Sequence, residues 1–341
     1  MDCLDEQTLL DFLAGRLDGA TTKRAREHVA QCEACNAIAT ELIVDAASHV
    51  KTSPPKVASY ELVPGAIFVE KYRLVRPLGE GGMGAVWEAE TIGGAEARVA
   101  VKLLKAFDAG AKKRFIREIA TTSRIVDPGL VRVVAVLEDV EAGCPALVLE
   151  LLPGESLASR LAREQRIDGR EARLVARTLA KTLATVHAAG LVHRDVKPAN
   201  VHLTGDAARP VVLLDLGLAK AMPGTNAGTP LTRLTRTGHS VGTPAYMAPE
   251  QLAGETELDA RADLWAIGVV LYECLTGTKP FAGRTAAELL RETAKGAPFP
   301  APGIEGETEA LLRELLAADR TSRPSSAADV ADRLARIEAG S

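Results

Sequence analysis

The sequence lacks any apolar run that approaches the roughly 20 residues needed to span a bilayer. It also lacks an excess of basic residues: the formal net charge of -4 argues against a general binder of nucleic acid or anionic membranes. The first residues are acidic, unlike a secretory signal, and five cysteines in 341 residues do not suggest a disulfide scaffold. We therefore expect a cytoplasmic protein that binds neither nucleic acid nor membrane.

Three stretches of different character follow one another along the chain. Residues 1–48 are acidic and carry apolar residues at helical spacing. Residues 49–70 contain a proline pair and a Pro-Gly turn, which indicate a linker. From residue 71 onward, strand patterns come first and helix patterns follow. This order predicts an α+β fold with a β-rich N-terminal lobe (71–152) and an α-helical C-terminal lobe (153–338).

The expected elements are marked by hydrophobic periodicity. Strands are predicted at residues 72–75, 85–89, 98–104, 131–137 and 146–151. Helices are predicted at residues 112–124, 170–188, 262–275, 286–295 and 307–317, with a last helix from residue 325 or 326.

A loop with concentrated polar chemistry stands at residues 191–200 (LVHRDVKPAN). It carries a carboxylate at Asp195, a cation at Lys197 and an amide at Asn200. Pro198 removes a backbone donor and clashes with a preceding helical turn, so the run cannot be a helix interior. A loop of this kind is more often a site than a connector.

Weaker signals precede this loop. Gly79, Gly81 and Gly84 lie between two predicted strands, where glycines let backbone amides approach a phosphate; a plain hairpin turn is the alternative. Lys102 ends a predicted buried strand, where a cation needs a partner such as a phosphate or the carboxylate of Glu118. The alternative is a surface lysine beside a solvated glutamate.

A further weak signal follows the loop. Asp215 ends a short apolar run and stands two residues before Gly217. An Asp at a strand end can supply oxygen ligands to Mg²⁺, although an Asp near a glycine is more often only a turn former.

The order of these features, together with the later run at residues 248–250 (APE), resembles the ordered motif set of the eukaryotic-like serine/threonine protein kinases of bacteria. The resemblance covers about residues 70–338. It implies the bilobal protein kinase fold and an ATP-dependent, non-specific serine/threonine protein kinase of bacterial signalling. The implied cofactors are ATP and Mg²⁺ or Mn²⁺, and the implied partners are proteins with exposed Ser or Thr.

The resemblance also implies roles for individual residues. Asp195 would accept the proton of the substrate hydroxyl, and Lys197 would steady the γ-phosphate. Lys102 would hold the α- and β-phosphates and pair with Glu118. These four are the expected catalytic residues.

The remaining positions of the implied site bind metal and nucleotide. Asn200 and Asp215 would bind Mg²⁺, Leu149 would be the gatekeeper, and Glu150 and Leu152 would offer backbone groups to adenine. The expected ATP-binding positions are Leu78, Gly79, Gly81, Gly84, Val86, Ala100, Lys102, Glu150, Leu152 and Leu203.

One position departs from the family pattern: Leu216 stands where the family usually has Phe. Leu is still apolar, so we expect activity to be retained. A competing interpretation is a pseudokinase scaffold that binds ATP and partners without phosphotransfer. A small-molecule kinase is a third interpretation, disfavoured by Lys197 and by residues 242–244 (GTP), which shape a peptide site in the family.

The segment between Gly217 and Glu250 has no acidic residue and is rich in threonine. Its composition fits an ordinary loop. The resemblance implies instead an activation loop, in which Arg194 attracts a phosphate and Thr235, Thr237 or both are autophosphorylated. Phosphorylation of one copy by another would involve a homodimer.

Residues near the N-terminus have metal-ligand spacing. His28, Cys32 and Cys35 would share one face of a helix, and Cys3 would complete a tetrahedral site of the kind that binds structural Zn²⁺. So small a unit would gain stability from a metal. Free cysteines beside a surface histidine and a redox pair of Cys32 and Cys35 are the alternatives. The unit resembles the anti-sigma-factor type of zinc finger, which implies a regulatory role and a protein partner.

Overall fold

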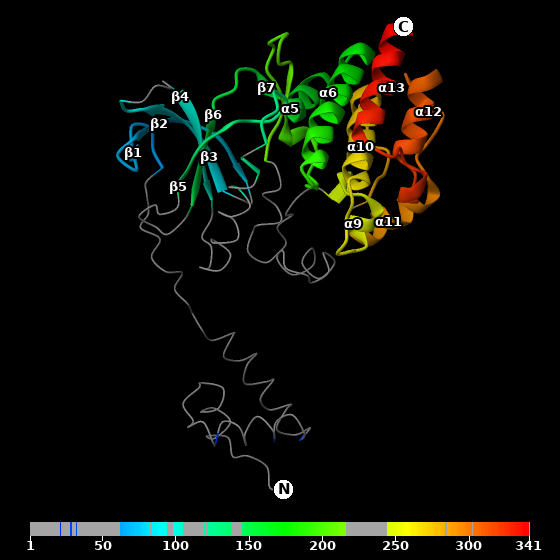
Figure 1. The fold of residues 1–341 in the computed structure, drawn as a ribbon, viewed down its shortest axis with the longest axis horizontal. Coiled ribbons are helices and arrows are strands. Elements are labelled where there is room, and N and C mark those ends of the chain that lie inside the picture. The colour runs from blue at the N-terminus through cyan, green and yellow to red at the C-terminus, as the bar shows by residue number, and fades with distance from the viewer. Residues whose placement is uncertain are drawn as a thin grey trace. The chain divides into compact units, whose positions relative to one another are not determined.

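The structure is a computed structural model of the chain (Figure 1). It describes residues 62–81, 84–93, 98–104, 119, 122–123, 125–137, 145–215, 244–283, 285–301 and 303–340, together with residues 21, 28 and 32. The chain divides into two compact units, Met1–Ser59 and Tyr60–Ser341. The second unit contains every element described below.

A six-stranded antiparallel sheet forms the first lobe of this unit, in the order β1-β2-β3-β4-β6-β5. Its strands are β1 (Ile67–Phe68), β2 (Tyr72–Gly81), β3 (Gly84–Thr91), β4 (Arg98–Leu104), β5 (Val133–Leu137) and β6 (Ala146–Glu150). The strands predicted from apolar alternation are confirmed, with ends shifted by a few residues.

The two faces of this sheet contact different parts of the molecule. One face packs a core that includes Tyr72, Trp87 and Val101. Successive side chains of a strand point to opposite faces, so Val86 and Lys102, which pair across β3 and β4, lie on the other face. The alternation therefore sends Lys102 away from this core.

The sheet begins earlier than the expected linker at residues 49–70 suggests. Strand β1 pairs with β2, and Phe68 is buried in the core together with packed side chains of Leu62 and Ala66. A strand of two residues is too short to produce a recognisable period, which explains why composition alone indicated a linker here. The earlier part of that stretch, residues 49–61, lies outside the described residues.

The second lobe is helical and is built around α10 (Arg261–Thr276). The other helices are α5 (Leu157–Glu164), α6 (Gly169–Ala188), α9 (Pro249–Leu252), α11 (Ala286–Lys295), α12 (Gly306–Leu315) and α13 (Ala327–Gly340). Helix α10 is apolar on nearly all sides, and such a helix must be buried; it packs against α6 and α12. None of the described helices is long and apolar enough to cross a membrane.

A small three-stranded sheet lies between the two parts: β7 (Glu155–Ser156), β8 (Val201–Leu203) and β9 (Val211–Leu213). Strands β8 and β9 are antiparallel, with Val201 opposite Leu213. This register brings Asn200, just before β8, to the same end of the sheet as Asp215, just after β9. The predicted α+β order of a β-rich lobe and a helical lobe is confirmed (Figure 1).

Candidate active site

A cavity of about 860 Å³ lies between the face of the large sheet that carries Lys102 and the second lobe. The predicted positions that line it are Leu78, Gly79, Val86, Ala100, Lys102, Leu149, Glu150, Leu152 and Asp215. Its volume falls within the range of about 300–1,000 Å³ that is usual for small-molecule sites. Residues from both lobes and from the segment that joins them therefore share one site.

Three further predicted nucleotide positions are not among the described residues that line this cavity. Gly81 pairs with Gly84 at the ends of β2 and β3, so the glycine cluster is a hairpin, and its Gly79 lines the cavity. Gly84 is not among the residues that line the cavity. Leu203 is buried in the core of the second lobe, and its neighbour His202 lines the cavity.

Lys102 forms the polar contact at the inner end of the cavity. Its side chain is 8% exposed, and Nζ donates a hydrogen bond to Oδ1 of Asp215 at 2.6 Å. A buried cation requires such a partner, so the alternative of a surface lysine is wrong. The expected partner Glu118 lies outside the described residues.

The three polar side chains predicted from the loop form one cluster. Lys197 Nζ donates to both carboxylate oxygens of Asp195 at 2.8 Å. Asn200 Nδ2 donates to Oδ2 of Asp195 at 2.9 Å and to its carbonyl oxygen at 2.8 Å. These bonds fix the direction of the Asp195 carboxylate.

Two hydrogen bonds join this loop to the segment that carries Asp215. The ring Nε2 of His193 lies 3.0 Å from the carbonyl oxygen of Leu214. The backbone N–H of Leu214 donates to the carbonyl oxygen of Asn200 at 2.8 Å. The Asp195 cluster and the Asp215–Lys102 pair are therefore held in one framework.

Asp263 of α10 supports this loop through hydrogen bonds to its backbone. The sequence did not lead us to predict this residue. Its carboxylate, 1% exposed, accepts the backbone N–H groups of His193 at 2.8 Å and Arg194 at 2.7 Å. His187 Nε2 lies 2.8 Å from the same carboxylate. Arg194 has a φ of 68°, and left-handed backbone costs an L-residue about 1–2 kcal/mol. Asp263 could have been identified from the sequence, because a charged residue within an otherwise apolar helix is unusual and indicates a buried polar contact.

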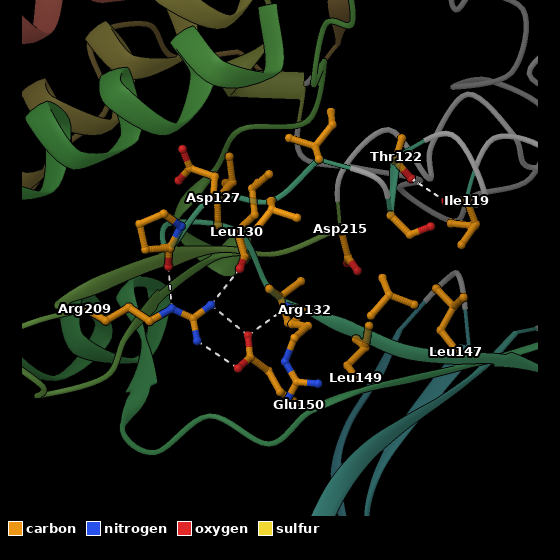
Figure 2. A pocket seen from close by; sticks show the side chains of 17 residues that line it. Ile119, Thr122, Asp127, Leu130, Arg132, Leu147, Leu149, Glu150, Arg209 and Asp215 are labelled. Carbon is orange, nitrogen blue, oxygen red and sulfur yellow. Dashed lines mark hydrogen bonds and ion pairs between the residues drawn. The ribbon is translucent and has the colours of Figure 1, made fainter. Parts of the chain in front are cut away.

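Arg209 is a second residue that the sequence analysis missed (Figure 2). Its Nη1 and Nη2 donate to the two carboxylate oxygens of Glu150 at 2.8 and 2.7 Å. The backbone N–H of Arg132 donates to Glu150 Oε1 at 2.7 Å. Burial raises the pKa of the Glu150 carboxyl, but the hydrogen bonds from Arg209 and Arg132 outweigh it and hold that pKa below its ordinary value.

Glu250 and Arg323 form a buried ion pair. The Arg323 guanidinium donates to both carboxylate oxygens of Glu250 at 2.7 and 2.9 Å, and both side chains are buried. The pair joins α9 to the segment before α13, so it is a structural contact of the second lobe.

The first unit offers two of the four expected zinc ligands. His28 is helical, and the backbone N–H of Cys32 donates to the His28 carbonyl oxygen at 2.8 Å, which places the two residues one helical turn apart. The His28 Nε2 atom is buried without a hydrogen-bond partner among the described residues. Cys3 and Cys35 lie outside those residues, and within them no group of three or more His, Cys, Asp or Glu could hold a metal.

Further predicted residues lie outside the described residues: Leu216, Thr235 and Thr237.

Comparison with known proteins agrees with this geometry. Residues 72–334 match the family model "Protein kinase domain". The chain is 36% identical to serine/threonine-protein kinase pkn2 of Myxococcus xanthus over 80% of this chain and 33% of that protein. It is 37% identical to PkaA of Streptomyces coelicolor over 75% of this chain and 48% of that protein. It is 36% identical to PknA of Mycobacterium tuberculosis over 81% of this chain and 63% of that protein.

The chain thus spans between about a third and somewhat under two thirds of the length of these curated relatives. Its matched region includes both lobes and every residue of the cavity described above. The chain therefore belongs to the protein kinase domain family, and within that family it is similar to bacterial serine/threonine-protein kinases.

Proposed function

We propose that this chain is an ATP-dependent protein kinase of bacterial signalling that transfers the γ-phosphate of ATP to serine and threonine side chains of proteins. The observation that carries the proposal is the juxtaposition of two polar groups. One is the Lys102–Asp215 ion pair in the cavity, and the other is the Asp195 carboxylate with its two donors. Membership of the protein kinase family supports the same activity.

The residues at this site fit Mg²⁺, or Mn²⁺, bound together with the substrate ATP. Lys102 occupies one carboxylate oxygen of Asp215, and Asn200 directs its Nδ2 to Asp195. One carboxylate oxygen and one amide oxygen are then available, and oxygen is the ligand that Mg²⁺ prefers. Mg²⁺ usually binds few protein carboxylates and completes its coordination with phosphates and water. When bound, the ion neutralises charge on the phosphates.

The residues of this loop would supply acid–base catalysis and electrostatic stabilisation for phosphate transfer. Asp195 would accept the proton of a hydroxyl that lies within about 2.6–3.2 Å of its carboxylate. Its orientation is already fixed by Lys197 and Asn200, which reduces the reorganisation needed to reach the transition state. Lys197 places a cation beside the hydroxyl and would stabilise the transferred phosphoryl group.

The base of the nucleotide would occupy the part of the cavity near the segment that joins the lobes. Val86 and Ala100 line this part from the sheet, where they would cover the ring. Glu150 and Leu152 line it from the joining segment, where their backbone groups would contact adenine.

The test of this function is transfer of labelled γ-phosphate to a protein substrate, followed by identification of the phosphorylated side chain. We expect phosphoserine and phosphothreonine. Nucleotide binding without any transfer would support the pseudokinase scaffold instead.

The proposal includes autophosphorylation at Thr235, Thr237 or both, with Arg194 as the cation that binds the phosphate and a homodimer as the assembly for transfer between copies. Arg194 supports this role because it stands directly before Asp195. Mass spectrometry after incubation with Mg-ATP checks the prediction. Phosphate found only outside residues 225–243 would contradict it.

The N-terminal unit is proposed to bind structural Zn²⁺ through Cys3, His28, Cys32 and Cys35 and to contact a regulatory protein partner. The buried, unpartnered Nε2 of His28 and the helical spacing to Cys32 support a ligand role. Metal analysis of reduced, purified protein should find about one zinc per chain. A His28→Ala variant should lose it, whereas zinc-free wild-type protein would contradict the site.

A further inference from the structure

The Arg209 side chain crosses from the second lobe to the first (Figure 2). Arg209 belongs to the turn between β8 and β9, whereas its partner Glu150 is the last residue of β6. Besides its two bonds to Glu150, the guanidinium donates to the carbonyl oxygen of Leu130 at 2.6 Å and to that of Pro128. One side chain therefore binds three points of the chain at the junction of the lobes.

The turn that presents Arg209 is firmly held. Thr204 Oγ1 donates to the carbonyl oxygen of Arg209 at 2.6 Å and accepts the N–H of Asp206 at 3.0 Å. The N–H of Thr204 donates to the carbonyl oxygen of Pro210 at 3.1 Å. Arg209 thus starts from a fixed backbone position in the second lobe.

The loop that Arg209 contacts is also anchored to the second lobe. Thr185 of α6 donates to Asp127 Oδ2 at 2.6 Å, and Asp127 Oδ1 accepts the N–H of Gly129 at 2.8 Å. The N–H of Leu213 in β9 donates to the carbonyl oxygen of Gly129 at 2.7 Å. The carbonyl groups that receive the guanidinium therefore do not depend on it for their position.

Glu150 is the member of this group that belongs to the first lobe. Strand β6 ends at this residue, and residues 151–154 carry the chain into the second lobe without helix or strand. Glu150 lines the cavity together with Leu149, Leu151 and Leu152. A constraint on the Glu150 carboxylate is therefore a constraint on the backbone that meets the base.

We propose that Arg209 is a positioning residue for nucleotide binding, because it holds the Glu150 carboxylate against the second lobe and so fixes the backbone at residues 150–152. This inference rests on the proposed function, in which those backbone groups contact adenine. The polar groups for the phosphates have separate supports, since Lys102 bonds to Asp215 and Asn200 bonds to Asp195.

Removal of the guanidinium would leave a carboxylate that is 15% exposed with only the N–H of Arg132 as its donor. An unpaired, largely buried charge is strongly unfavourable, so Glu150 would turn toward water and pull the end of β6 with it. The affinity for the base would fall, whereas the rate of the chemical step would not.

The test uses full-length protein and measures KM for ATP, kcat, and the Kd of Mg-ADP. Arg209→Met should raise KM and Kd about tenfold, which corresponds to about 1.4 kcal/mol, with kcat within about twofold of wild type. Arg209→Lys should give a smaller increase, because a lysine cannot form the bidentate contact. Thermal unfolding of each variant verifies that it is folded.

A matched control is available on the far side of the helical lobe. Arg333 of α13 forms a bidentate ion pair with Glu314 of α12, with N–O distances of 2.6 and 2.8 Å. Neither residue lines the cavity. Arg333→Met removes a bidentate ion pair whose carboxylate is more exposed, and it should leave KM and Kd at wild-type values.

A double-mutant cycle tests whether Arg209 acts through Glu150. Glu150→Gln should raise KM, and the Arg209→Met, Glu150→Gln double variant should be no worse than Arg209→Met alone, since the two residues share one interaction. If Arg209→Met does not fold, Glu150→Gln and Arg209→Lys are judged by the same KM criterion.

The inference is overturned if the folded Arg209 variants keep wild-type KM and Kd, if they lose kcat with KM unchanged, or if the cycle is additive. A wild-type protein that transfers no phosphate, whether or not it binds Mg-ADP, would instead refute the proposed function. The two failures are therefore distinguishable.

Discussion

At the scale of single residues, Asp263 determines the backbone of the loop that carries Asp195. It accepts two backbone N–H groups, and one of the two donors, Arg194, has a left-handed φ. Asp263→Asn removes the charge and leaves at least one donor without an acceptor. An unsatisfied buried donor costs about 1–3 kcal/mol, so we expect a loss of that size in the free energy of unfolding, measured with urea, and a larger loss in phosphate transfer. Wild-type stability and rate would contradict this role.

The Arg209–Glu150 pair gives a pH prediction. The pKa of Glu150 in the folded chain lies below its ordinary value of 4.5. A carboxyl with a depressed pKa stabilises the fold above the unfolded value and loses that contribution as the pH falls through the folded value. The difference in unfolding free energy between wild type and Arg209→Met should therefore be largest at neutral pH and shrink below about pH 4.5. A constant difference from pH 7 to pH 3 would be inconsistent with this pair.

Single residues also show what the sequence could and could not predict. Short local patterns in the sequence were enough to identify Lys102, Asp195, Asn200 and Asp215. In the structure Lys102 bonds to Asp215, and Asn200 bonds to Asp195. Asp263 and Arg209 act on partners 70 and 59 residues away. Such contacts leave no local pattern, because nothing near either residue in the chain indicates its partner.

At the scale of elements, the central helix α10 is packed so tightly that a methyl group matters. A Cβ at Gly268 would lie 2.9 Å from Leu315 Cβ and 3.0 Å from Leu316 Cδ2. Alanine is favoured over glycine in a helix by about 1 kcal/mol, whereas overpacking costs about 1–3 kcal/mol. We expect Gly268→Ala to lower the free energy of unfolding by up to about 2 kcal/mol, because packing outweighs propensity.

A second glycine provides the control for that prediction. At Gly169, in the first turn of α6, a Cβ would meet its nearest atoms only at 3.4 and 3.8 Å. Gly169→Ala should be neutral or slightly stabilising in the same urea measurement. If both variants changed stability equally, propensity and not packing would dominate at Gly268.

Periodicity predicted the long elements well and failed on the shortest. Helices α6, α10, α11, α12 and α13 and strands β2 to β6 lie at their predicted places, with ends shifted by a few residues, because their apolar residues repeat over two or more turns or pleats. Helices α5 and α9 were not predicted. Strand β1 has two residues and no period, and its place is set by the burial of Phe68 against the sheet. Tertiary contacts, and not local periodicity, determine the structure of such a short segment.

At the scale of the whole molecule, the described residues join the two lobes of the second unit at several points. These are the segment after β6, the loop before β5 that pairs with β9 through Leu130 and Leu213, the Lys102–Asp215 ion pair, and the Arg209 side chain. Residues from both lobes line the cavity. Catalysis by this chain would therefore depend on the relative position of the lobes, which no local sequence pattern specifies.

The central claim is that this assembly transfers phosphate from ATP to protein hydroxyl groups through Asp195. The most direct measurement compares the rate of γ-phosphate transfer for wild type, Asp195→Asn, and Asp332→Asn, which removes an exposed carboxylate of α13 as a control. Positioned acid–base chemistry contributes about 10²–10⁴-fold, so Asp195→Asn should lose activity by that factor while Asp332→Asn keeps it. Equal rates for wild type and Asp195→Asn would contradict the account.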